Sequence, residues 1–140
     1  MTDQAAIEIA AGLLERHEDI RLTLYKCTAG KNTIGVGRNL DDKGITLDEA
    51  KYLLSNDIRE KIEFLSTKPY WVGLDSYRKA VLIDLAHCVG NSGFDGFRKM
   101  NAALAAGNYT EAADQILDSA FAKQTGGRAD DLAKIMRRGS

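Results

Sequence analysis

The sequence predicts an α+β fold that is mostly helical. Two short β-rich segments follow one another near the N-terminus, residues 21–26 (RLTLYK) and 32–36 (NTIGV), with a turn-like stretch between them. Apolar residues recur at helical spacing through most of the remaining chain. The chain has 140 residues, 44% of them hydrophobic, and a single proline. This length and composition fit one compact domain with room for two lobes.

A first helix is expected to run to about His17, with Ile9, Leu13 and Leu14 on its buried side. Glu18 then lies at or just past the C-terminal end of that helix. The helix dipole disfavours a carboxylate there, and so it favours the protonated form that can act as an acid. From its position alone, Glu18 also fits an ordinary solvated glutamate.

A β-hairpin follows, with its turn expected over residues 29–32. Gly35 and Gly37 fall in the second strand, where a missing side chain indicates a bulge or the close approach of another backbone or a ligand. Two strands this short are marginal alone, so the hairpin must pack on helices or frame a groove. Three chemically useful side chains stand at its mouth: Glu18, Cys27 and Thr33.

Helices are expected from the hairpin onward. Thr46 and Glu49 form the pattern of a capping box, and apolar residues at helical spacing continue it into a helix over residues 47–66. Residues 76–89 are apolar on nearly every side, which predicts a buried helix. Shorter helical segments with inward apolar residues complete the chain: residues 92–107, a helix capped by Thr110, and residues 128–138.

The hairpin region carries a motif with fixed spacing. Eight residues separate Glu18 from Cys27, and five separate Cys27 from Thr33. This pattern resembles the signature of the phage-type lysozymes, the glycoside hydrolase family of the T-even phage lysozyme and its relatives, in which the middle residue is Asp or Cys. The resemblance covers nearly the whole chain, because it continues through residues 44–58 (GITLDEAKYLLSNDI), 74–97 (LDSYRKAVLIDLAHCVGNSGFDGF) and 124–139 (QTGGRADDLAKIMRRG).

The resemblance implies a lysozyme-like fold with two lobes. A hairpin lobe would span about residues 18–46, a connecting helix residues 47–66, and a helical lobe residues 67–140 together with 1–17. It also implies hydrolysis with inversion, without metal or cofactor. Glu18 would be the acid, and Cys27 and Thr33 would position the attacking water. Because a free thiol is mostly uncharged at neutral pH, a partly ionised base and a nucleophile stay open as alternatives for Cys27, with water positioning favoured.

Further site residues follow from the resemblance. Arg128 matches an arginine that sits against the catalytic glutamate, where it orients the carboxylate and, in opposition to the helix dipole, favours its ionised form. A surface arginine at the start of a helix stays open as the alternative. Arg38 and Asp57 match a pair of positions that hold the hairpin to the connecting helix by charge. Four more residues match the substrate-binding side of the cleft: Gly37, His87, Cys88 and Asn91.

Composition excludes several other classes of function. The net charge of −1 gives no strong attraction to nucleic acid or an anionic membrane. No apolar run approaches the roughly 18 residues of a membrane span, and the N-terminus lacks the pattern of a secretion signal. A chain made in the cytosol keeps its thiols reduced, so Cys27 and Cys88 are expected to be free. His17 and His87 have no partner at metal-ligand spacing.

The expected function is that of an N-acetylmuramidase acting on the glycan strands of peptidoglycan. The resemblance implies a phage endolysin, a monomer that waits in the host cytoplasm until a holin opens the membrane to the periplasm. A tail-associated lysozyme is less favoured, because no further domain is present. Two alternatives stay open: a lytic transglycosylase, which uses no water and so has no need of Cys27 and Thr33, and an inactive cell-wall-binding module with the same fold.

Overall fold

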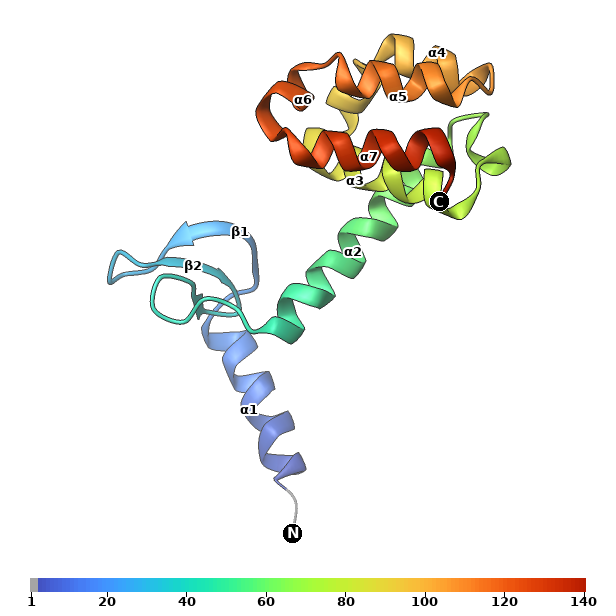
Figure 1. The fold of residues 1–140 in the computed structure, drawn as a ribbon. Coiled ribbons are helices and arrows are strands. Elements are labelled where there is room, and N and C mark those ends of the chain that lie inside the picture. The colour runs from blue at the N-terminus through green and yellow to red at the C-terminus, as the bar shows by residue number, and fades with distance from the viewer. Residues whose placement is uncertain (1–2) are drawn as a thin grey trace. The chain divides into compact units, whose positions relative to one another are not determined.

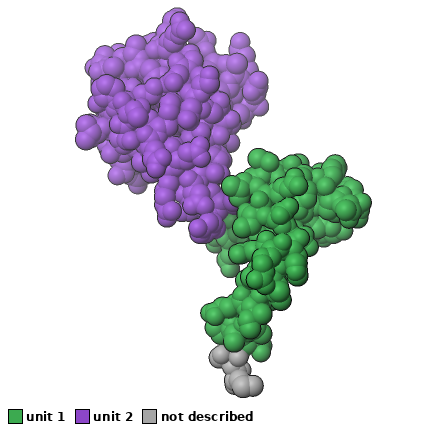
Figure 2. Space-filling model, turned by 180° about the vertical axis from the view of Figure 1, so that it is seen from behind, with its two compact units in different colours: residues 1–51 green, residues 52–140 purple. Residues whose placement is uncertain are grey.

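The computed structural model describes residues 3–140 and confirms a mostly helical α+β fold (Figure 1). The chain divides into two compact units, residues 1–51 (unit 1) and 52–140 (unit 2), which Figure 2 colours separately. The elements are α1 (Gln4–His17), β1 (Arg21–Lys26), β2 (Asn32–Gly35), β3 (Arg38–Asn39), α2 (Leu47–Leu65), the short 3₁₀ helix Trp71–Gly73, α3 (Ser76–Asp95), α4 (Arg98–Ala105), α5 (Tyr109–Leu117), α6 (Ala120–Thr125) and α7 (Gly127–Arg138).

The sheet of unit 1 is antiparallel, with the strand order β1-β2-β3. Tyr25 of β1 pairs with Thr33 of β2, and Thr33 pairs in turn with Asn39 of β3. The register of β1 against β2 shifts between Arg21 and Tyr25, so the pairing of the two strands is irregular over this stretch. Thr33 therefore lies on the central strand, with a paired strand on each side.

The turn between β1 and β2 begins earlier than the predicted residues 29–32. The Gly30 N–H donates to the carbonyl of Cys27 at 2.9 Å and closes a β-turn over residues 27–30. Gly30 then takes a left-handed φ of 78°. A turn followed by a left-handed glycine is a common way to close a hairpin, and it puts Cys27 at the first turn position.

Unit 1 has almost no hydrophobic core. Thr33 is the only buried residue among its described residues. The three residues that the sequence assigned to the buried side of the first helix are exposed: Ile9 by 65%, Leu13 by 40% and Leu14 by 52%. Three short strands offer too little apolar surface to cover a helix of this length. The assignment of residues 1–17 to the helical lobe stays a prediction.

The predicted start of α2 is confirmed by its cap. The Thr46 hydroxyl accepts from the Glu49 N–H at 3.2 Å, and the Glu49 carboxylate accepts from the Thr46 N–H at 2.9 Å. These two bonds form the capping box that the sequence indicated. The helix ends at Leu65, one residue before the predicted end.

Unit 2 holds the hydrophobic core, and α3 runs through it. The helix predicted for residues 76–89 is present, and Gly90 kinks it with a φ of 78° and a ψ of 169°. The second half of α3 takes up residues that the sequence assigned to the next helix, so that α4 begins only at Arg98. Five α3 residues are buried: Val81, Leu82, Leu85, Ala86 and Phe94. His87 and Cys88 lie exposed just before the kink.

Among the last helices of unit 2, α7 packs against α3, α5 and α6, and α5 also packs against α4. Asn108 caps α5 by accepting from the Glu111 N–H at 3.0 Å, where Thr110 was predicted to cap it. Asn108 takes the N-cap position because α5 begins at Tyr109, so that Thr110 already lies inside the helix. Helix α6 was not predicted. Among residues 3–140, no helix has the length and apolar character needed to cross a membrane.

Candidate active site

Glu18 lies at the C-terminal cap of α1. Its N–H donates to the Leu14 carbonyl at 2.8 Å, and its side chain is exposed. Gly37, between β2 and β3, lies directly against the carboxylate: a Cβ atom on Gly37 would stand 2.9 Å from Oε2 and 3.1 Å from Cδ of Glu18. The sequence predicted the close approach of another backbone or a ligand at Gly37, and the group that approaches is instead the Glu18 side chain. Only glycine leaves this space free.

Cys27 and Thr33 share one backbone acceptor. The carbonyl of Lys31 accepts from the Cys27 N–H at 2.9 Å and from the Thr33 hydroxyl at 2.9 Å. The Thr33 residue is 3% exposed, whereas Cys27 is half-buried with a free thiol. The structure therefore brings these two predicted residues together at the start of the hairpin turn.

The surroundings of Cys27 favour its ionised form. The backbone N–H of Lys31 lowers the pKa of the thiol most strongly, and that of Ala29 comes next. Burial opposes these two N–H groups. A thiolate held by N–H groups carries the negative charge that an aspartate would supply at this position.

Arg38 has a different partner from the one expected. Its guanidinium donates to both carboxylate oxygens of Glu49, at 2.8 Å and 2.7 Å, and also to the Gly44 carbonyl at 3.2 Å. The expected partner, Asp57, is an exposed residue of unit 2. Arg38 pairs with Glu49 because the loop from β3 to α2 is short and brings the first turn of α2 close to Arg38. Arg38 and then the Thr46 N–H lower the pKa of Glu49 to about 2.

Arg128, at the start of α7, forms an ion pair with Asp84 of α3. Its Nη2 lies 2.7 Å from Oδ1, and its Nε donates to the same oxygen at 2.8 Å. This hydrogen bond raises the pKa of Arg128. Both residues and His87 line a cavity of about 350 Å³ in unit 2, whose other walls are apolar: Leu54, Ile58, Ala80 and Ile83. The contact of Arg128 with Glu18 stays a prediction.

Asn91 and Cys88 lie on either side of the α3 kink. The Asn91 side chain accepts from the Lys61 ammonium of α2 at 2.8 Å. Cys88 is exposed with a free thiol. Within residues 3–140, no group of three or more His, Cys, Asp or Glu side chains is arranged to hold a metal ion.

Sequence reasoning missed three polar residues that hold these side chains. Asp84 was detectable, because it interrupts the apolar run of α3 between buried Leu82 and Leu85. Lys61 gave no signal beyond its position on an amphipathic helix. Asp41, which bonds the start of β2, lies in a stretch recognised only as turn composition.

Comparison with known proteins decides the family. The family model described as phage lysozyme matches residues 15–139. The chain belongs to the phage lysozyme family. The match begins before Glu18 and ends after Arg128, so it includes every predicted site residue of this phage lysozyme.

Two curated relatives differ in how much of their own length aligns with this chain. The chain is 26% identical over 159 residues to the pre-baseplate central spike protein Gp5 of Enterobacteria phage T4, with 93% of the chain aligned. It spans only 28% of that protein's length. It is 29% identical over 133 residues to the endolysin of Acyrthosiphon pisum secondary endosymbiont phage 1, with 90% of the chain and 87% of the endolysin aligned.

Proposed function

We propose that this phage lysozyme is an N-acetylmuramidase that cuts the β-1,4 bond between N-acetylmuramic acid and N-acetylglucosamine in peptidoglycan. The observation that carries the proposal is the composition of unit 1. An exposed carboxylate stands against a glycine, and a thiol stands beside a buried hydroxyl on the hairpin. Hydrolysis of a glycosidic bond needs an acid for the leaving oxygen and a group that activates water on the opposite face.

The chemistry assigns one role to each residue. Protonated Glu18 gives its proton to the glycosidic oxygen as the bond to the anomeric carbon breaks. A water held by Cys27 and Thr33 attacks that carbon from the opposite face and transfers its proton to the Cys27 thiolate. The products are a reducing N-acetylmuramic acid end of inverted configuration and a free hydroxyl on N-acetylglucosamine. Acid, base and water suffice for this reaction, so no metal or cofactor takes part.

The remaining predicted residues support the catalytic residues or bind the glycan strand. Arg128 orients Glu18, and Arg38 and Asp57 hold the hairpin to α2. The ion pair of Arg38 with Glu49, in the first turn of α2, supports the part of Arg38 in this proposal. The glycan strand is contacted by four residues: Gly37, His87, Cys88 and Asn91.

The endolysin relative supports a role in host lysis, since 87% of its length aligns with this chain. In this role the enzyme acts as a monomer on peptidoglycan, after a holin has given it passage from the host cytoplasm to the cell wall. The match to the T4 spike protein supports a second candidate, a lysozyme domain of a tail-associated protein. Both roles use the same reaction.

The test is mass spectrometry of the fragments that the purified protein releases from peptidoglycan, beside a Glu18→Gln variant. We expect fragments that end in reducing N-acetylmuramic acid, and none from the variant. Anhydro ends in place of reducing ends would identify a lytic transglycosylase. No fragments from the unaltered protein, combined with sedimentation on peptidoglycan, would identify a binding module.

A further inference from the structure

One peptide group lies at the centre of the Cys27 and Thr33 pair. The carbonyl of Lys31 accepts the Cys27 N–H and the Thr33 hydroxyl, both at 2.9 Å. This carbonyl and the N–H of Asn32 belong to the same planar peptide unit. Any rotation of that unit therefore moves the acceptor that both predicted catalytic residues share.

The opposite side of the same peptide unit is held by Asp41. The Asn32 N–H donates to Asp41 Oδ2 at 2.7 Å, and the Asn32 side-chain amide donates to Oδ1 at 3.1 Å. The first of these bonds is the main reason that the pKa of Asp41 is lowered. A third hydrogen bond holds the loop after β3 to Asn32, since the Leu40 N–H donates to the Asn32 carbonyl at 2.7 Å.

A carboxylate on the N–H of a peptide group strengthens its carbonyl as an acceptor. Hydrogen bonds in a chain polarise one another, and a bond to an ionised group is the stronger kind. The chain here runs from the Asp41 carboxylate, through the peptide unit, to the Thr33 hydroxyl. Thr33 has a single proton, which it gives to the Lys31 carbonyl. Its lone pairs are then left to accept a proton from water.

We propose that Asp41 is a positioning residue of the hydrolytic site, which fixes the Lys31–Asn32 peptide unit and through it the orientation of Cys27 and Thr33. This inference rests on the proposed muramidase function, because the orientation of the pair matters only if the pair holds water. Among the described residues, Asp41 has no hydrogen bond to Cys27 or Thr33, so it acts on them through Asn32 and the Lys31–Asn32 peptide unit.

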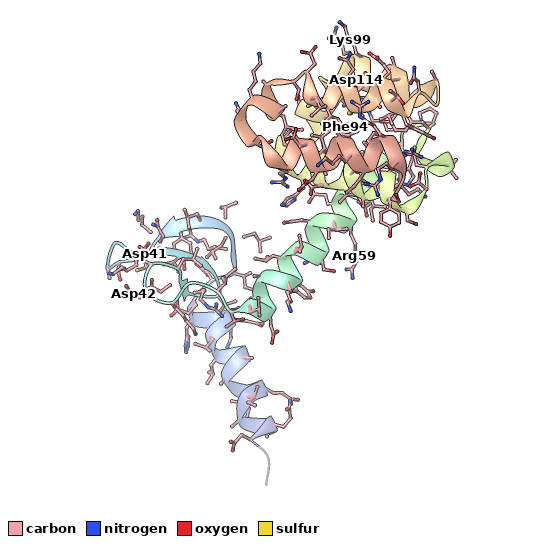
Figure 3. All side chains as sticks on the ribbon, viewed as in Figure 1. Asp41, Asp42, Arg59, Phe94, Lys99 and Asp114 are labelled. Atoms are coloured by element: carbon pink, nitrogen blue, oxygen red, sulfur yellow. The ribbon has the colours of Figure 1, made fainter. Side chains whose placement is uncertain are left out.

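The neighbouring Asp42 provides a matched control. It is exposed like Asp41, lies on the same loop beside the sheet (Figure 3) and carries the same charge. Its carboxylate bonds side chains only, the Lys31 ammonium at 3.2 Å and the Asn39 amide at 3.0 Å. Loss of Asp42 therefore removes an equal charge and a comparable number of contacts, and leaves the peptide unit held by Asp41.

The experiment compares Asp41→Ala, Asp41→Asn and Asp42→Ala in two assays. The first measures kcat and KM on soluble peptidoglycan fragments. We expect kcat to fall about 10- to 100-fold in Asp41→Ala with little change in KM, because displacement of a reacting group by about 1 Å costs that much. Asp41→Asn keeps an acceptor for the Asn32 N–H but not for its amide, and should recover part of the rate. Asp42→Ala should retain the full rate.

The second assay follows alkylation of Cys27 against pH, read by peptide mass spectrometry so that Cys88 is counted separately. We expect the pH midpoint for Cys27 to move upward in Asp41→Ala and to stay in place in Asp42→Ala. A general loss of stability would lower the melting temperature, but it would not shift the pH midpoint for alkylation of Cys27 alone.

Two results would overturn the inference. Equal kcat losses in Asp41→Ala and Asp42→Ala, with equal Cys27 midpoints, would show that the loop charge matters and the peptide unit does not. The inference would also be overturned if Asp41→Asn and Asp41→Ala fold and their pH midpoint for alkylation of Cys27 equals that of the unaltered protein. If the unaltered protein releases no fragments, the muramidase proposal fails, and the Cys27 midpoint still decides the role of Asp41.

Discussion

Gly37 gives the most direct control over the position of Glu18. In Gly37→Ala the new methyl group would stand 2.9 Å from Glu18 Oε2, so the carboxylate must move. This atom is the end of a flexible side chain, so its displacement costs little stability. The left-handed φ of 69° adds about 1 kcal/mol of backbone strain. We expect kcat to fall about 10- to 100-fold, with a small decrease in melting temperature.

A second glycine separates the two effects in Gly37→Ala. Gly107 has a φ of 71°, and apart from its chain neighbours no atom lies within 4 Å of the place that a methyl group would take. Gly107→Ala therefore carries the strain without the displacement. This variant should lose a similar amount of stability and keep its activity. If both variants keep full activity, the Glu18 carboxylate does not depend on the space at Gly37.

The role of Cys27 can be tested by replacing its thiol with a carboxylate or a hydroxyl. The N–H groups of Lys31 and Ala29 stabilise a negative charge at this position, and a carboxylate can accept from them as a thiolate does. We expect Cys27→Asp to keep much of the activity and Cys27→Ser to lose about 100-fold or more, since a serine is neutral at working pH. The measurement is the rate of fragment release. Equal losses in the two variants would contradict a shared role for Asp and Cys.

At the scale of elements, the join between the hairpin and α2 depends on Glu49. This carboxylate accepts from Arg38 of β3 and from the Thr46 N–H, and its pKa is lowered from 4.5 to about 2. A lowered pKa in the folded state contributes stability that is present above pH 4.5 and is lost as the pH falls toward 2. Both partners are partly exposed, so we expect a modest effect.

The prediction concerns the difference between the unaltered protein and Glu49→Gln. Hydrogen exchange of residues 32–46 should be slower in the unaltered protein at about pH 6, and the difference should vanish toward about pH 2. Glu60→Gln, which alters an exposed carboxylate further along α2, should behave like the unaltered protein throughout. A difference that persists at the acid end would mean that charge at Glu49 is not what holds the join.

Patterns local in sequence were the ones that could be predicted. The start of α2 followed from Thr46 and Glu49, because a capping box involves neighbouring residues only. The spacing of Glu18, Cys27 and Thr33 indicated a candidate site only through the resemblance to the phage-type lysozymes, and the roles of the three residues stay predictions. The pairing of Arg38 with Glu49 could not be read, because Asp57 offers the same charge on the same helix and the choice depends on the path of a loop. The contact of Asp41 with Asn32 could not be predicted either, since its partner is a backbone N–H, which every residue except proline carries.

At the scale of the whole molecule, the two units differ in how they are stabilised. Every buried hydrophobic residue among residues 3–140 belongs to unit 2. Unit 1 depends on backbone pairing, turn hydrogen bonds and ion pairs, which individually contribute little. Segments with few buried apolar contacts open most easily. Helix α1 nevertheless presents Ile9, Leu13 and Leu14, and a stripe of this kind is stable only when it is covered.

We predict that α1 packs on the helical lobe in the folded enzyme, as the assignment of residues 1–17 to that lobe requires. If so, Ile9→Ala and Leu13→Ala should each lower the free energy of unfolding by about 2–4 kcal/mol, the cost of truncating a buried aliphatic side chain. The measurement is chemical denaturation followed by circular dichroism. Glu15→Ala alters the polar side of the same helix and should stay within about 0.5 kcal/mol.

The outcome separates two architectures for this family member. If Ile9→Ala and Leu13→Ala change stability no more than Glu15→Ala, the stripe is exposed to solvent and α1 belongs with the hairpin, as the boundary of unit 1 has it. If they destabilise, hydrogen exchange must also rise within unit 2, because a helix that packs on a core protects the amides that it covers. Destabilisation confined to residues 18–46 would contradict the predicted packing, since it would show that the stripe stabilises the sheet instead.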